Sequence, residues 1–147
     1  YLSSAKEEAK ARERRERTAE IFAADIDGGA VELARRHARR AGVERYIRFK
    51  TADAAEFSSE AKNGVIVTNP PYGEKVLDEK RARELIGTLG GVYKKLDNWS
   101  LFAISRDAAF EKAFGRKADK TRKLYNSEKE CRFYEYFSKR EKKEDGR

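Results

Sequence analysis

A four-residue turn, Asn69-Pro70-Pro71-Tyr72, carries the residue types best suited to chemistry. It follows the apolar run 64–67 directly, and its two prolines are the only prolines in the chain. A residue that precedes proline is pushed to extended geometry, so Asn69 and Pro70 are both held extended. The turn therefore presents the Asn69 side-chain oxygen and the Pro70 carbonyl oxygen as fixed acceptors. Two such acceptors match the two hydrogens of an exocyclic aromatic amine.

This pair of acceptors predicts a particular reaction. An amine that donates both hydrogens is drawn toward tetrahedral geometry, and its lone pair can then attack an electrophilic methyl group. Preorganised acceptors accelerate steps of this kind, and Tyr72 adds a flat face on which a base can stack. The alternative is an ordinary turn that ends the strand, in which the Tyr72 ring only fills space in the packing. The position of the turn, after a buried strand and two crossovers beyond an acid-ended strand, favours the chemical interpretation.

Two acids also stand at predicted strand ends. Asp25 ends a short buried strand, and Asp53 closes the next one. Ligands of mostly parallel α/β sheets bind beyond the carboxyl ends of the strands, where Asn69 is also expected. Each acid could instead have a purely structural role. Asp25 could cap the helix that follows, although Asp27 is better placed to do so, and Asp53 could stabilise a turn.

The elements that must position these residues alternate along the chain. The pattern predicts helices over 3–20, 28–41, 79–96 and 107–114, and strands over 21–25, 46–49, 64–68 and 99–105. Two further runs, 122–125 and 131–137, read as an antiparallel hairpin. Strands that alternate with helices predict an α/β fold with a mostly parallel sheet and right-handed crossovers.

Composition limits the class of protein. The 147 residues suit one domain, and the net charge of +8 makes a polyanionic partner plausible. The single cysteine excludes an internal disulfide and a cysteine-based metal cluster, so we expect a reducing, cytoplasmic setting and no metal site. No window is long and apolar enough to predict a membrane span.

The basic residues are spread over several predicted elements. Those of the helix 28–41 are expected to form a solvated face. Lys117, Lys120, Arg122 and Lys123 lie nearer the hairpin and are better candidates for contact with a nucleic-acid backbone.

Four stretches together resemble one family of enzymes. Asn69-Pro70-Pro71-Tyr72 matches motif IV of the S-adenosylmethionine-dependent amino-methyltransferases, and its extension over 68–74 is similar to the THUMP-associated branch. The stretch "AADIDGGAVELARRHARRAGV" is similar to motif II of this family and the helix after it. The stretch "FKTADAAEF" is similar to motif III, and "RKLYNSEKECRFYEY" resembles the closing hairpin of the family. That branch includes the 23S rRNA guanine-N2 methyltransferases of the large-subunit L type, which are often labelled N6-adenine-specific DNA methylases.

The resemblance implies a Rossmann-like class I methyltransferase fold and a role for each matching residue. Asp25, with its neighbour Ile26, would bind the ribose of S-adenosyl-L-methionine. Asp53 would face the adenine of this cofactor, with the Ala54 backbone nearby. The catalytic residues implied are Asn69, Pro70, Pro71 and Tyr72, which would hold the target base, and Asn69 would also contact the cofactor.

One part of the family pattern has no match. The first strand and the Gly-x-Gly turn that should precede the first helix are absent from residues 1–147. In the family fold this strand lies between those that end in Asp25 and Asn69, so each would lose a hydrogen-bonding neighbour. The resemblance thus implies a methyltransferase domain that is incomplete at its N-terminus and lacks the THUMP domain. We expect residues 1–147 alone to bind the cofactor weakly or not at all.

The function that the resemblance implies is methyl transfer from S-adenosyl-L-methionine to the N2 amine of guanine in 23S rRNA. Large-subunit rRNA is the expected partner, and no membrane is expected. The sequence leaves the oligomeric state open, and a monomer is expected for the full-length parent. Two alternatives stay open: an adenine-N6 methyltransferase that acts on DNA, and a basic nucleic-acid-binding fragment without catalysis.

Overall fold

The computed structural model describes residues 1–12, 19–71, 76–126 and 129–138, and it divides the chain into two compact units. One unit spans Tyr1–Asp53 and the other Ala54–Arg147. No helix of the described residues is long and apolar enough to cross a membrane.

The first unit contains one parallel strand pair and its crossover helix. Its elements are α1 (Leu2–Ala11), β1 (Ile21–Asp25), α2 (Gly28–Arg40), the 3₁₀ helix η1 (Glu44–Tyr46) and β2 (Ile47–Thr51). β1 pairs with β2 in parallel, from Ile21 opposite Ile47 to Asp25 opposite Thr51. The connection through α2 is the βαβ unit that alternating patterns predict.

Two predicted boundaries in this unit were wrong. The first helix does not reach residue 20: α1 ends at Ala11, residues 19–20 are not helical, and residues 13–18 lie outside the described part. None of its residues is buried, so α1 rests on local propensity alone, which holds short helices weakly. Tyr46 belongs to a 3₁₀ turn closed by its bond to the Val43 carbonyl, and the strand runs on to Thr51.

The second unit is a four-stranded mixed sheet in the order β3-β4-β6-β5. Its elements, in chain order, are η2 (Ala54–Glu56), β3 (Gly64–Thr68), α3 (Val76–Lys94), β4 (Trp99–Ser105), α4 (Phe110–Phe114), β5 (Lys120–Asn126) and β6 (Lys129–Tyr136). β3 and β4 are parallel, whereas β6 is antiparallel to both β4 and β5. The predicted antiparallel hairpin is confirmed, although both of its strands are longer than expected.

The two later helices also differ from their predicted ranges. α3 begins at Val76 and ends at Lys94, because Lys95 and Leu96 form tighter bonds to carbonyls three residues back. α4 begins at Phe110 rather than at residue 107, since the Asp107 side chain accepts the Ala109 N–H and forms a turn there.

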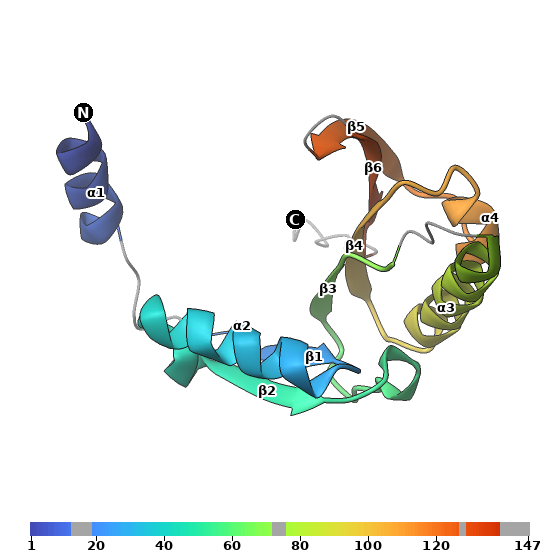
Figure 1. The fold of residues 1–147 in the computed structure, drawn as a ribbon, viewed down its shortest axis with the longest axis horizontal. Helices are drawn as coiled ribbons and strands as arrows, with labels where there is room; N and C mark the ends of the chain where they lie inside the picture. The colour runs from blue at the N-terminus through green and yellow to red at the C-terminus, as the bar shows by residue number, and fades with distance from the viewer. Residues whose placement is uncertain (13–18, 72–75, 127–128, 139–147) are drawn as a thin grey trace, which may run out of the picture. The chain divides into compact units, whose positions relative to one another are not determined.

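The core of the second unit lies between the sheet and the helix pair α3 and α4 (Figure 1). Its members are Ile86, Leu89, Tyr93, Leu101, Ala103, Phe110, Phe114, Tyr134 and Tyr136. The rings of Phe110 and Tyr134 stack at 4.3 Å, and the hydroxyls of the buried tyrosines donate to backbone carbonyls. Burial raises the pKa of Tyr134 and Tyr136, so both phenols act as neutral donors in this core.

Candidate functional site

Asp25 and Asp53 emerge at the same edge of the first unit. Asp25 is the last residue of β1, and Asp53 comes two residues after the end of the neighbouring parallel strand β2. The Ala52 N–H donates to the Asp25 carbonyl at 3.0 Å, which extends the ladder past Thr51 and keeps the two strand ends together. The predicted juxtaposition of the two acids is therefore present within this unit.

Local hydrogen bonds orient the Asp25 carboxylate. Its Oδ1 accepts the Asp27 N–H at 2.9 Å, while Asp27 Oδ1 accepts the Gly29 N–H at 2.7 Å as the N-cap of α2. The prediction that Asp27 rather than Asp25 caps the helix is confirmed. Asp25 is exposed, and the next side chain, Ile26, is 71 % exposed. A fixed carboxylate beside an exposed apolar group suits a ligand that combines hydroxyls with a flat ring.

The Asn69 turn lies at the carboxyl end of β3 in the second unit. Thr68, the last residue of β3, pairs with Ala103 of β4, so Asn69 leaves the sheet beside the last residues of β4. Asn69 and Pro71 are exposed, whereas Pro70 is buried, and all three lie outside helix and strand. Tyr72 lies outside the described residues, and Ala54 begins η2 in this same unit.

A network at the end of β4 fixes the loop beside this turn. Asp107 accepts from Arg83 of α3 at 2.9 Å and from the Ala109 N–H at 2.8 Å. Its N–H donates to Ser105 Oγ, and its carbonyl accepts from the Tyr134 hydroxyl at 3.2 Å. Hydrogen bonding from the Arg83 guanidinium lowers the pKa of Asp107 more than burial raises it. Sequence reasoning missed this network, because it joins residues that are 24 positions apart.

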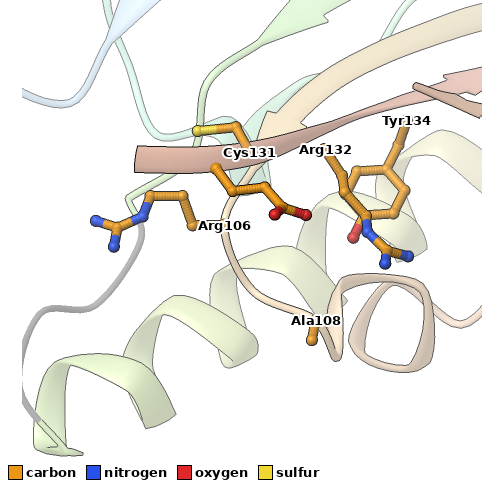
Figure 2. Close-up of a pocket in the computed structure, with 6 residues that line it drawn as sticks. Arg106, Ala108, Cys131, Arg132 and Tyr134 are labelled. Carbon is orange, nitrogen blue, oxygen red and sulfur yellow. The ribbon is translucent and has the colours of Figure 1, made fainter. Parts of the chain in front are cut away.

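A small pocket lies at the same edge of the sheet, where the loop after β4 meets the start of β6 (Figure 2). It measures about 190 Å³ and is lined by Arg106, Ala108, Glu130, Cys131, Arg132 and Tyr134. Cys131 and Tyr134 are buried, whereas Arg106 and Arg132 are exposed.

Two basic residues proposed from the sequence for backbone contact are engaged elsewhere. Arg122 lies 2.6 Å from Glu135, and Lys123 lies 2.8 Å from Glu130. These neighbours in β5 point to opposite faces of the sheet, as strand geometry requires, and each meets an acid of β6. Lys117 and Lys120 are exposed.

The fold and the strand ends define the class. Both units carry parallel strands joined through helices, and the polar residues singled out above lie at carboxyl ends of those strands, as in Rossmann-like domains. The α/β fold of class I methyltransferases, with its antiparallel C-terminal hairpin, is thus confirmed. The chain belongs to the family described as "RMKL-like, methyltransferase domain", whose model matches residues 2–135.

Relatives and solved structures extend this assignment. The chain is 40% identical over 119 residues to "Putative RNA methyltransferase YpsC" of Bacillus subtilis, covering 81% of this chain and 31% of that protein. It is 37% identical over 117 residues to "Ribosomal RNA large subunit methyltransferase K/L" of Shewanella baltica, covering 79% of this chain and 16% of that protein. The chain thus spans less than a third of the length of either relative.

Among solved structures, the "possible methylase" of Clostridium difficile 630 superposes with a TM-score of 0.85 at 40% identity, over 92% of this chain and 36% of that one. The "putative methyltransferase" SMU.472 was solved in complex with SAH. It superposes with a TM-score of 0.86 at 37% identity, over 96% of this chain and 37% of that one.

Proposed function

We propose that this chain forms part of an enzyme that transfers a methyl group from S-adenosyl-L-methionine to the exocyclic N2 amine of guanine in 23S rRNA. Membership of the RMKL-like methyltransferase domain family supports the reaction class. The names of the Shewanella and Bacillus relatives support RNA as the substrate, and the SAH in SMU.472 supports the cofactor. A cytoplasmic location follows from this substrate.

The residues of the first unit fit the nucleoside part of the cofactor. One oxygen of Asp25 is bound by the Asp27 N–H, which leaves the other oxygen to accept from ribose hydroxyls. Ile26 would cover a face of the adenine, and Asp53 would meet its amino edge. When bound, the cofactor would supply a methyl group on a positively charged sulfur. The nitrogen–methyl bond would form as the sulfur–methyl bond breaks, S-adenosylhomocysteine would leave, and the amine would release one proton to water.

The residues of the Asn69 turn would hold and activate the target amine. The Asn69 side-chain oxygen and the Pro70 carbonyl would accept its two hydrogens and leave the nitrogen lone pair free for attack. Pro71 keeps the preceding residue extended, and Tyr72 would stack on the base. A guanine within paired RNA must first leave the stack, which costs roughly a few kcal/mol.

One observation carries this proposal: an exposed asparagine at a parallel strand end, followed by a buried proline, in a chain of this family. The test compares Asn69→Ala with Asn69→Asp, which keeps an acceptor oxygen. The matched control is Asn63→Ala, an exposed asparagine at the other end of β3. All variants are made in the longest native polypeptide that contains residues 1–147.

We expect Asn69→Ala to lower kcat by about 10²–10³-fold, as loss of a preorganised polar group does. Asn69→Asp should retain more activity, and Asn63→Ala should match the wild type. RNA affinity should stay within about twofold in all three, because a single base contact adds little to a backbone-dominated interaction. Full activity of Asn69→Ala would refute the proposed role.

The same assay separates the two alternatives. A Listeria monocytogenes protein of known structure, 35% identical to this chain, is described as a "predicted N6-adenine-specific DNA methylase". Labelled methyl groups recovered as N2-methylguanine from rRNA support our proposal, whereas N6-methyladenine from DNA supports that alternative. Binding to RNA without any methylated product would favour the non-catalytic module.

A further inference from the structure

The pocket beside the Asn69 turn carries charge that the proposed reaction does not yet use. Thr68 of β3 pairs with Ala103 of β4, and Ser105 of β4 pairs with Arg132 of β6. Three adjacent strands therefore bring the Asn69 turn and Arg132 to one edge of one sheet. Neighbouring strands lie about 4.8 Å apart, so the backbones at these two positions are roughly 10 Å apart across the edge.

The charges around the pocket leave Arg132 as its available cation. Glu130, the acid of the lining, is paired with Lys123 at 2.8 Å. Arg132 is exposed, and within the described part of the chain no ion pair or hydrogen bond engages its guanidinium. Arg106 also lines the pocket, but its guanidinium points away from Arg132 (Figure 2). The charge of Arg132 therefore favours an anion on its side of the pocket.

The volume of the pocket and the residues that line it limit which kind of anion can bind there. A volume of about 190 Å³ is below the roughly 300–1,000 Å³ that whole small-molecule ligands occupy. A phosphate group fits this volume better than a base does. The Tyr134 hydroxyl at the floor already donates to the Asp107 carbonyl, so the guanidinium has to supply the recognition. Arginine binds phosphate through two parallel hydrogen bonds, which fixes position as well as charge.

We infer that Arg132 binds a backbone phosphate of the RNA strand that carries the target nucleotide. This inference rests on the proposed function, because the distance to Asn69 matters only if the target base is held there. The pocket would then set which nucleotide of the strand reaches the turn. Phosphate contacts position nucleic acids in this way, whereas base contacts specify the sequence.

The test measures RNA affinity as a function of salt for Arg132→Gln and Arg132→Lys. Lys112→Gln is the matched control, because Lys112 is exposed on α4 of the same unit and its loss removes the same charge. The probe is an rRNA-derived single strand, titrated without cofactor between about 50 and 200 mM salt. Since Arg132 is exposed, thermal melting should confirm that its variants fold.

We expect Arg132→Gln to lower the slope of log K against log salt by about 0.7, the value for one phosphate contact on a single strand. Its affinity should fall about tenfold at the lowest salt, while KM for S-adenosyl-L-methionine stays unchanged. Arg132→Lys should restore the slope, and Lys112→Gln should leave both quantities at wild-type values. An unchanged slope for Arg132→Gln, or an equal loss in Lys112→Gln, would overturn the inference.

Failure of this inference and failure of the proposed function give different results. If Asn69→Ala abolishes methylation but Arg132→Gln binds RNA like the wild type, the reaction stands and the phosphate site is wrong. If Arg132→Gln loses one phosphate contact and no product forms from any substrate, the phosphate site stands and the enzymatic proposal is wrong.

Discussion

The contact between α3 and α4 depends on one glycine, and two neighbouring substitutions test this dependence. Gly90 is buried, and a Cβ built there would lie 2.9 Å from the Phe114 carbonyl carbon and closer still to its oxygen. Gly91 is exposed, and a Cβ there meets nothing within 4 Å. Gly90→Ala and Gly91→Ala therefore each add one methyl group to α3, the first at a buried position and the second at an exposed one.

The expected magnitudes follow from two opposing effects. Alanine is more favourable than glycine in a helix interior by about 1 kcal/mol, and both variants gain this amount. Gly90→Ala must also push α4 from α3, against the packing of the fully buried Phe110 and Phe114. Overpacking of a core costs about 1–3 kcal/mol, and a rigid carbonyl places the cost at the upper end. We expect Gly91→Ala to be stabilised by about 1 kcal/mol and Gly90→Ala to be destabilised by about 2 kcal/mol.

Trp99 makes the measurement specific to the second unit. It is the single tryptophan of the chain, and it packs against the core that α3 and α4 share. Urea unfolding followed by its fluorescence gives the free energy of unfolding of that unit for each variant. A difference of about 3 kcal/mol between the two variants is expected, and helix propensity cancels in it. Equal stabilities would refute the close approach of α4 to Gly90.

Three further outcomes are expected. Asp107→Asn should destabilise the second unit at neutral pH, because it removes the carboxylate that pairs with Arg83. Since Arg83 lowers the folded-state pKa of Asp107, this loss of stability should shrink as pH falls below about 4. A difference in urea midpoint that does not change with pH would contradict this expectation. Asp27→Ala should lower the stability of α2 by about 1 kcal/mol, measured by amide exchange, whereas Asp25→Ala should weaken cofactor binding at least tenfold in the native polypeptide and leave α2 closer to wild type. Calorimetry with S-adenosyl-L-methionine should detect weak or no binding to residues 1–147 alone, since they contain no Gly-x-Gly turn, and micromolar binding would contradict this expectation.

The sequence predicted the features that local rules determine. Asp27 was expected to cap α2 because a short acceptor stood directly before a helical pattern, and it does so. Asp25 and Asn69 were expected at strand ends because each follows an apolar run, and the parallel pairing places them there. Each of these inferences depends on fewer than ten consecutive residues.

Features that depend on pairing between distant segments could not be predicted from the sequence. Nothing in the sequence sets the register that puts Arg122 beside Glu135 and Lys123 beside Glu130, so these two residues looked available for phosphate. Arg132 lies among the same hairpin residues but faces the pocket at the end of β4, and only the register opposite Ser105 distinguishes it. The Arg83–Asp107 pair depends on how α3 lies against the sheet, which no spacing encodes.

The two prolines of the Asn69 turn have different physical roles, and this explains why the turn needs both. Pro70 is buried, so it anchors the turn to the second unit while its carbonyl remains outside any helix or strand bond pattern. Pro71 is exposed and has no packing role of that kind, so its effect is to hold the residue before it extended. One proline thus fixes where the turn sits, and the other fixes the direction of its carbonyl. The role proposed for this turn, in which two oriented oxygens hold one amine, requires both constraints, because loss of either one would let an acceptor rotate away from the amine.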